Sequence, residues 1–471
     1  MSQPPSKRSS LPLDNLSQAQ REAVEKHLND LYDNYLEEVS NLIIEAKTMV
    51  PNATYDEGLP LDNARGELER YARQANIIAQ DYYRNVRAAW AEAAQVELPA
   101  YEDAMVSSDR AAWQVFHGYS DSDFAGLKFT DVINHRAKSG MTMDDLWAKK
   151  TAGYGDADWS KLAKDVINST TRLTQQLTAE KDPSEPRYAR VPSGPTCEFC
   201  IMLASRGFVY WTAESAGRNN LYHNDDNCQI VSSWGKMRVN GYDPDGMKKR
   251  WQSCAASVKG WATRDRYDAY RADTAEKLTR DEYEKYLAST GDAKPLSYDG
   301  WKEKNTLKFD EWKTRQALAE MRWRDPRWLY DGTEPPITFP DAKQKAETEQ
   351  ARPQEIRTAE RLRKHGVRPA FQIDHKYVRN EETGIEERIG LADFAGGIEI
   401  KTPDKARKFR SVDDYMGSAG KKADCIRLII DNTENPNMSD AQLIEHIKAS
   451  NRFKGGKVYI LTKDEKLRRI K

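Results

Sequence analysis

Two carboxylates and one lysine near the C-terminus have types and spacing that could carry out metal-assisted hydrolysis. Asp393 precedes the pair Gly396–Gly397, and Glu399 and Lys401 follow that pair two positions apart. Alternate residues of a strand point to the same side, so Glu399 and Lys401 are predicted to share one face. The glycine turn would bring Asp393, on the preceding strand, beside both of them.

A hard divalent cation suits this group of side chains, because Mg²⁺ and Mn²⁺ prefer oxygen ligands. Asp393, Glu399 and the backbone carbonyl of Ile400 could supply three, leaving positions for water and a phosphate oxygen. Lys401 could then orient the attacking water or stabilise charge that develops on phosphorus. The sequence therefore predicts a nuclease site; the alternative is a solvated hairpin with an incidental salt bridge.

The same segment resembles the PD-(D/E)xK nuclease superfamily. The resemblance implies a restriction-endonuclease-like core that begins with a helix and continues through strands bearing Asp and Glu-x-Lys. Glu355, Leu362 and Gly366 match the superfamily's first-helix pattern of Glu, Leu and a helix-ending Gly. Glu355 is therefore a further candidate catalytic residue, with Glu360 as the second choice, whereas the usual proline before Asp393 is missing.

Thr402 and Pro403 extend the match to a narrower group, because this segment is similar to the transfer-RNA-cleaving toxin domains of contact-dependent inhibition proteins. That resemblance implies a nucleic-acid substrate, transfer RNA first of all, with other RNA or DNA as the alternatives, and a cognate immunity protein as a candidate partner. Basic residues that follow the motif could contact phosphates or could form only a solvated face: Lys405, Arg407, Lys408, Arg410, Lys421 and Lys422.

His375 supports a different chemistry, since a metal-free ribonuclease could use a histidine as its general base. The alternative for this residue is a strand histidine whose hydrogen bonds are satisfied beside Asp374.

Four potential metal ligands lie in the middle of the chain: Cys197, Cys200, His223 and Cys228. The two-residue gap between the first two cysteines lets both thiolates reach one ion, and four ligands would complete a closed, structural Zn²⁺ site. The alternative is that these thiols pack in a small core. Cys254 lies outside the spacing and is expected to be buried and inert.

The stretch around these cysteines resembles the MuF-like minor head (head morphogenesis) proteins of tailed phages. The resemblance implies a virion component associated with portal and capsid proteins. The usual Cys-x-Cys ending is replaced here by residues 224–227 and a single cysteine. The match rests on Arg190, Val191, Pro192, Cys197, Cys200, Met202, Leu203, Ala204, Ser205, Arg206, Gly207, Tyr210, Ala216, Gly217, Tyr222, His223 and Cys228.

Helical periodicity dominates the residues that precede this module. It predicts helices over 16–50, 62–94, 100–116, 143–150 and 159–179, after a disordered arm at 1–15. The expected organisation is a helical head-morphogenesis region at 16–180, a Cys/His module at 185–246, an aromatic-rich helical region at 247–330 and a proline-bearing linker at 331–352. Six tryptophans in the aromatic-rich region are expected to anchor cores or interfaces rather than to stack on bases.

A mixed α/β domain is predicted over 353–471, with the order αβββαβαβ. Helices are expected over 353–365, 411–423 and 439–450, and strands over 368–377, 387–393, 397–401, 425–431 and 457–462. The predicted fold class is therefore multidomain: mainly α-helical N-terminal and middle regions with a small Cys/His module, then a restriction-endonuclease-like α/β domain.

Composition limits the classes of protein that remain. The 471 residues include 38% hydrophobic and 31% charged residues with a net charge of −1, and no apolar run long enough for a membrane span, so no membrane partner is expected. Residues 341–471 hold 28 basic and 22 acidic side chains, and this basic end is the one expected to contact nucleic acid. Five cysteines exclude a disulfide scaffold.

These features predict a phage minor head protein with a C-terminal nuclease effector, located in the virion and in the host cytoplasm during assembly or after delivery. The competing hypothesis is a purely structural virion protein whose last domain binds DNA or another protein without cleaving it.

Overall fold

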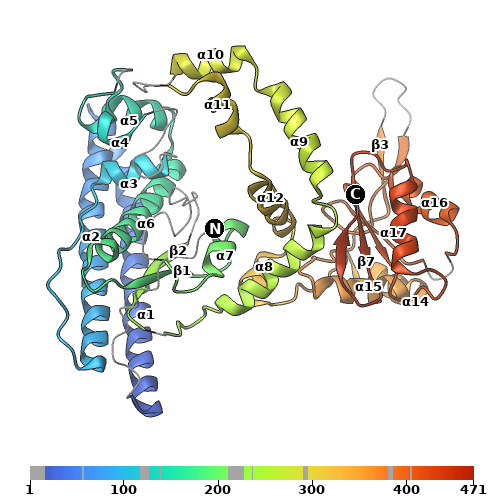
Figure 1. The fold of residues 1–471 in the computed structure, drawn as a ribbon, viewed down its shortest axis with the longest axis horizontal. Coiled ribbons are helices and arrows are strands. Elements are labelled where there is room, and N and C mark those ends of the chain that lie inside the picture. The colour runs from blue at the N-terminus through green and yellow to red at the C-terminus, as the bar shows by residue number, and fades with distance from the viewer. Residues whose placement is uncertain are drawn as a thin grey trace. The chain divides into compact units, whose positions relative to one another are not determined.

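A computed structural model describes residues 16–55, 58–116, 127–137, 139–210, 227–235, 237–289, 295–379, 386–403 and 406–471. Their backbone is mostly helical, with small sheets that gather mainly in the C-terminal region (Figure 1). The described residues separate into two compact units. One is drawn from Met1–Thr196, Cys200–Asp245 and Leu278–Glu303, and the other from Cys197–Phe199, Gly246–Lys277 and Lys304–Lys471.

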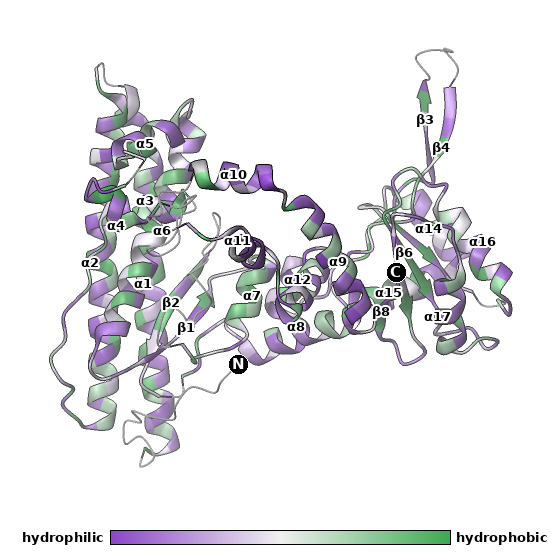
Figure 2. Cartoon of the chain, turned by 45° about the horizontal axis from the view of Figure 1, so that its top comes forward, coloured by the Kyte–Doolittle hydropathy of each residue, from purple (hydrophilic) through white to green (hydrophobic). Residues whose placement is uncertain are grey.

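Three long helices form the centre of the first unit: α1 (Gln18–Asn52), α2 (Pro60–Ala94) and α6 (Asp156–Lys181). Their apolar positions recur at three- and four-residue intervals and are buried together, and α2 shows this division into two faces in Figure 2. The rings of Tyr35 and Tyr82 stack there at 4.4 Å between centroids. The predicted helices at 16–50, 62–94 and 159–179 are therefore confirmed.

Shorter elements complete this unit. They are α3 (Ser108–Val115), α4 (Phe129–Ile133), α5 (Met143–Thr151), most of α7 (Glu198–Ala204), α10 (Arg280–Ser289), most of α11 (Tyr298–Asn305) and the antiparallel pair β1 (Arg187–Pro192) and β2 (Cys228–Ser233). The helix predicted over 100–116 is confined to α3, and the five-residue α4 was not predicted. No helix in the described part of the chain is long and apolar enough to cross a membrane.

The second unit contains a four-stranded sheet in the order β5-β6-β7-β8. Its strands are β5 (Ile398–Lys401), β6 (Arg427–Asp431), β7 (Lys457–Leu461) and β8 (Leu467–Arg469), of which the first three are parallel and β8 is antiparallel to β7. A separate hairpin, β3 (His375–Arg379) with β4 (Glu386–Gly390), stands away from the sheet (Figure 2).

Helices cover both faces of the sheet, as the alternation of strand side chains requires. Ile429 packs with α15 (Pro353–Arg363) in one core, whereas Leu428 and Ile430 pack with α16 (Phe409–Ala419) and α17 (Asp440–Ala449) in the other. The predicted order αβββαβαβ is confirmed, and the three-residue β8 is an addition. The first strand, predicted over 368–377, is instead β3 at His375–Arg379, because residues 370 and 371 form only isolated bridges with Thr338 and Phe394. A restriction-endonuclease-like fold remains a proposal.

Residues 331–352 are not the linker that their composition predicted. Phe339 stacks on Phe371 with centroids 4.7 Å apart, Thr338 pairs with Ala370, and α14 (Ala342–Ala351) follows. Ile337 also packs against the core shared by α15 and the sheet. Because these side chains are held by residues of the α/β region, the segment belongs to the second unit.

The aromatic-rich region also contributes to this unit, through α8 (Pro244–Lys259), α9 (Arg264–Lys277), α12 (Phe309–Met321) and α13 (Pro326–Asp331). Trp328 is buried and its Nε1 donates to the carbonyl of Lys364 at 3.1 Å. The ring of Trp323 lies 5.3 Å from that of Tyr459 on β7. The expectation that these tryptophans anchor a core is confirmed for both.

Candidate active site

The edge strand β5 positions the central pair of the candidate site. Ile398 and Ile400 point into the core shared with α15, so Glu399 and Lys401 point to the opposite face, as predicted. Gly396 and Gly397 precede the strand with φ of +82° and +72°, a left-handed conformation that favours glycine. A Cβ on Gly397 would lie 2.2 Å from the carbonyl oxygen of Asp424, so that position has no room for a side chain.

Asp393 lies in the loop after β4 rather than on the strand predicted at 387–393. The neighbouring Phe394 pairs with Ile398, which folds the loop back beside β5. One carboxylate oxygen of Asp393, Oδ2, accepts a hydrogen bond from the amide of Ile400 at 2.9 Å. Burial first, and then the negative charge of Glu399, raise the pKa of Asp393 to about 7, although Lys401 opposes the shift.

Glu399 is 1% exposed and is the most deeply buried acid of the group. Its Oε1 accepts a hydrogen bond from Lys401 Nζ at 2.6 Å. Its Oε2 has no hydrogen-bond partner among the described residues, and the nearest cation is Lys422 Nζ at 4.0 Å. A buried carboxylate oxygen is costly when no donor reaches it, and Lys422 at this distance offers charge compensation without a hydrogen bond.

Lys422 belongs to the site, since its Nζ also donates to the carbonyl of Leu391 at 2.7 Å. The sequence placed this residue in a basic rim around the site, and the structure brings it to the carboxylates themselves. Opposing effects act on the pKa of Lys401. Burial lowers it, but the negative charges of Glu399 and Asp393 raise it by more, so the pKa of this ammonium group is above its usual value.

Glu355 joins the cluster from the first turn of α15. Its pKa is raised, chiefly by burial, and the charges of Lys401 and Glu399 act on it directly. The Oε2 of Glu355 lies 3.5 Å from Arg352 Nη1 in an ion pair, but it accepts no hydrogen bond from the described residues. Glu360, the second choice, is exposed and pairs with Arg363 at 3.3 Å, so only Glu355 is brought to the site.

Two supporting residues were missed by the sequence analysis. The carboxylate of Asp424 accepts hydrogen bonds from the Ala392 amide and from Gln372 Nε2, both at 2.7 Å. The same Nε2 donates to the Ala392 carbonyl at 2.9 Å, and the Gln372 amide donates to the Asp393 carbonyl at 3.1 Å. Together they fix the loop that carries Asp393, and no local pattern marks residues 52 positions apart as partners.

The other predicted phosphate-contacting residues lie around α16. Arg407, Lys408, Arg410 and Lys421 are exposed, and Arg410 lies 4.0 Å from Asp414 in a weak ion pair. Lys405 lies outside the described residues.

His375 begins the hairpin strand β3 rather than joining the carboxylates. Its Nδ1 lies 3.2 Å from Arg388 Nη2, and its ring meets that of Tyr377 edge-on. These contacts agree with the interpretation of a strand histidine.

The predicted zinc ligands are only partly described. Cys200 and Cys228 are buried, Cys197 is partly exposed, and none of them forms a disulfide, whereas His223 lies outside the described residues. Over the part of the chain that the structure describes, no three His, Cys, Asp or Glu side chains are grouped to hold a metal ion. The four-ligand zinc site therefore remains a prediction.

Glu355, Asp393 and Glu399 are therefore not grouped as three side-chain ligands of one ion either. The predicted ligand set has two side chains, Asp393 and Glu399, with a backbone carbonyl as the third ligand. The unpartnered oxygen of Glu399 and the perturbed carboxyl of Asp393 fit a divalent cation by their chemistry.

A comparison with known families identifies the first half of the chain. A family model described as VG15 protein matches residues 15–254. The chain belongs to the VG15 protein family. This family is phage-associated, and no curated protein or solved structure matches the chain significantly. The VG15 match covers α1 to α6 and the cysteine module and ends within α8, so the cluster at Glu355, Asp393, Glu399 and Lys401 lies beyond it.

Proposed function

We propose that this VG15-family chain is a minor virion protein of the phage head whose C-terminal unit is a divalent-metal-dependent nuclease. The helical region and the cysteine module would associate with portal or capsid proteins. The catalytic cluster would act on nucleic acid in the host cytoplasm after delivery, or during assembly.

The observation that carries the nuclease proposal is the state of Glu399. A carboxylate that is 1% exposed has one oxygen paired with Lys401 and the other without a donor among the described residues. A core that needed only a salt bridge would gain nothing from a second acid beside it, yet Asp393 lies close enough for burial and the charge of Glu399 to raise its pKa to about 7. Such an arrangement is typical of a site that binds a cation during function.

Mg²⁺ or Mn²⁺ would be held by Asp393 and Glu399 with the backbone carbonyl of Ile400. When bound, the ion would polarise a phosphate oxygen and lower the pKa of a coordinated water. Glu355, partly buried beside the same charges, would accept a proton or orient a water from the α15 side.

The lysines of the site have separable roles. Lys401 is held against Glu399 and would stabilise the negative charge that develops on phosphorus. Lys422 is tied to the Leu391 carbonyl and would neutralise a neighbouring phosphate, with Arg407, Lys408, Arg410 and Lys421 contacting the strand further away. The resemblance to transfer-RNA-cleaving toxin domains favours RNA as substrate and a cognate immunity protein as partner.

Incubation of the purified full chain with total RNA and with plasmid DNA tests the proposal. Each substrate is tested with Mg²⁺, with Mn²⁺ and with EDTA, and Glu399→Ala is the inactive control. Cleavage that requires metal and Glu399 is expected. Failure to cleave either substrate with any ion would favour the structural virion protein, and cleavage that persists in EDTA but is lost in His375→Ala would favour the metal-free ribonuclease.

A further inference from the structure

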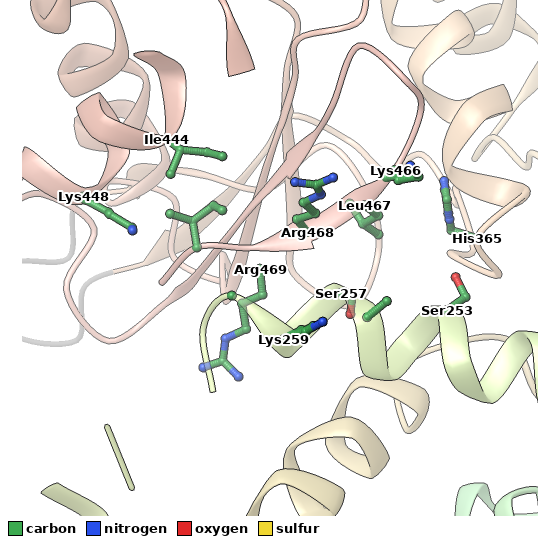
Figure 3. Close-up of a pocket in the computed structure, with 13 residues that line it drawn as sticks. Ser253, Ser257, Lys259, His365, Ile444, Lys448, Lys466, Leu467, Arg468 and Arg469 are labelled. Carbon is green, nitrogen blue, oxygen red and sulfur yellow. The ribbon is translucent and has the colours of Figure 1, made fainter. Parts of the chain in front are cut away.

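A cavity lies at the other edge of the sheet, away from the carboxylate cluster. It has a volume of about 840 Å³ and is bounded by the C-terminal half of α8, the end of α15, α17 and strand β8. The sheet order places β5, which carries Glu399, at one edge and β8 at the opposite edge. Figure 3 shows Leu467, Arg468 and Arg469 of β8 on one side of the cavity and Ser253, Ser257 and Lys259 of α8 on the other.

The lining of this cavity is strongly cationic. Five cations contribute to it from α8, α17, β8 and the turn before β8, and no Asp or Glu is among its lining residues: Lys259, Lys448, Lys466, Arg468 and Arg469. Two of these cations are partly neutralised, Lys466 by Asp464 at 2.6 Å and Arg469 by the buried Glu320 at 3.6 Å. Lys259, Lys448 and Arg468 form no ion pair within the described part of the chain.

Further cations lie close to Arg469, outside the residues that line the cavity. Burial lowers the pKa of Arg469. The positive charges of Arg266 and Arg427 lower it too, whereas Tyr459 and Glu320 raise it. The guanidinium of Arg469 is nevertheless fixed, because it lies 3.6 Å from the ring centroid of Trp261. Lys259, Lys448 and Arg468 are exposed, and like charges gathered around a cavity produce a positive potential that attracts anions.

The remaining lining is apolar or carries hydroxyl groups. Ile444 is a partly exposed aliphatic side chain, whereas Leu467 and Ile470 are mostly buried in the cores on the two faces of the sheet. Ser253 and Ser257 line the α8 side, and the Ser257 hydroxyl donates to the carbonyl of Cys254 at 2.7 Å. The ring of His365 also lines the cavity, with Nε2 2.7 Å from the carbonyl oxygen of Glu465. Burial and the nearby Arg324 lower the pKa of His365, so its imidazole is neutral at physiological pH and offers a flat surface.

We propose that this cavity binds a nucleoside phosphate, with the phosphate on the cations of β8 and α17 and the base against the aliphatic side chains. The volume falls in the range of about 300–1,000 Å³ that is usual for small-ligand sites. The ligand has one chemistry but two possible sources, a free nucleotide or one nucleotide of a nucleic-acid strand. The site does not depend on the proposed nuclease activity.

Binding is measured by calorimetry on the full chain carrying Glu399→Ala, in EDTA, so that neither cleavage nor the metal site contributes. The probes are adenosine triphosphate, a ten-nucleotide single-stranded RNA and inorganic tripolyphosphate. Adenosine triphosphate is expected to bind, and tripolyphosphate at least about tenfold more weakly because it lacks the base. If the RNA competes with adenosine triphosphate at equal or higher affinity, the natural ligand is a nucleotide of a strand. If the RNA does not compete, the natural ligand is a free nucleotide.

The variant Lys448→Ala/Arg468→Ala should weaken binding by about tenfold or more, since charge-assisted contacts of this kind are lost. Lys248→Ala/Lys249→Ala is the matched control, because it removes two exposed cations from α8 outside the cavity lining. Equal affinity in both double variants, equal affinity for tripolyphosphate and the nucleotide, or no binding of any probe would overturn the proposal.

Discussion

Lys401 Nζ lies 2.6 Å from Oε1 of Glu399, while the other oxygen of the same buried carboxylate has no hydrogen-bond partner among the described residues. One ammonium group therefore compensates half of a carboxylate that is 1% exposed. Beside it, Asp393 adds a second acid whose ionisation is disfavoured. Lys422 Nζ lies 4.0 Å from the second oxygen, and the proposed divalent cation would add the contact that this oxygen lacks.

Variants of the cluster should separate metal binding from chemistry. Asp393→Ala and Glu399→Ala each remove a ligand and should abolish most cleavage and weaken Mg²⁺ binding. Lys401→Ala should retain metal binding while cleavage slows by about 10²–10³-fold, the usual effect of losing one electrostatic stabiliser. Cleavage rates and calorimetric metal titration measure these effects. Glu445→Ala, which changes an exposed acid on α17, is the control and should leave both unchanged.

The raised pKa of Asp393 predicts how metal affinity depends on pH. Metal binding requires the ionised carboxylate, so affinity for Mg²⁺ should rise with pH and level off above about 7. Titrations between pH 5.5 and pH 8.5 test this directly. An affinity that stays constant across that range would show that Asp393 is not a ligand.

The same shift predicts a stability effect with the opposite sign. Asp393 is protonated more readily in the folded than in the unfolded protein, so without metal the free energy of unfolding should fall as pH rises from about 4 to about 7. Asp393→Asn should remove this loss and stabilise the metal-free C-terminal unit at pH 8 by on the order of 1 kcal/mol, or about 2–4 °C in Tm. Scanning calorimetry in EDTA measures the change, and wild type and variant should converge near pH 4.

The glycine turn before β5 offers a matched pair of substitutions. Gly396→Ala meets no atom within 4 Å and should cost only the strain of its positive φ, about 1–2 kcal/mol. Gly397→Ala has the same strain and also meets the Asp424 carbonyl at 2.2 Å, so it should destabilise the unit further by about 1–3 kcal/mol. Chemical denaturation of both variants measures the difference. Equal stability would mean that the approach of Asp424 to the turn is not as close as described.

Trp328 should be essential for the stability of the α/β region even though it precedes the predicted linker. Trp328→Ala removes a buried ring that packs against Gly366 and donates a hydrogen bond to the Lys364 carbonyl. The free energy of unfolding should fall by about 3–5 kcal/mol. Limited proteolysis should find residues 331–352 protected in wild type and cleaved early in the variant. Tyr377→Ala, which removes a ring that is 62% exposed, should change neither.

Zinc content tests the prediction for the cysteine module. One equivalent per chain is expected after purification without chelator, with a lower content in Cys197→Ser and Cys228→Ser because each loses a thiolate ligand. Elemental analysis measures it, and Cys254→Ser is the control outside the proposed ligand set. Zinc well below one equivalent in wild type would instead favour thiols that pack in a core.

The sequence by itself determined the elements of the α/β region and the relation of its central pair. Short apolar runs over 425–431 and 457–462 predicted β6 and β7, and the alternation of strand side chains placed Glu399 and Lys401 on one face. The glycine pair predicted the turn. These predictions depend on residues close in the chain, where geometry follows from local periodicity, whereas Glu355 was a candidate only through the resemblance to the PD-(D/E)xK superfamily.

Tertiary structure alone decided the rest, because contacts between distant residues leave no local pattern. Gln372 and Asp424 fix the Asp393 loop across 52 positions, and Lys422 reaches Glu399 from the end of α16. Proline and charge made residues 331–352 resemble a linker, yet Phe339 stacks on Phe371 because a neighbouring surface is available to bury it. The cationic cavity likewise forms only where α8 meets β8, since its charges come from segments about 200 residues apart.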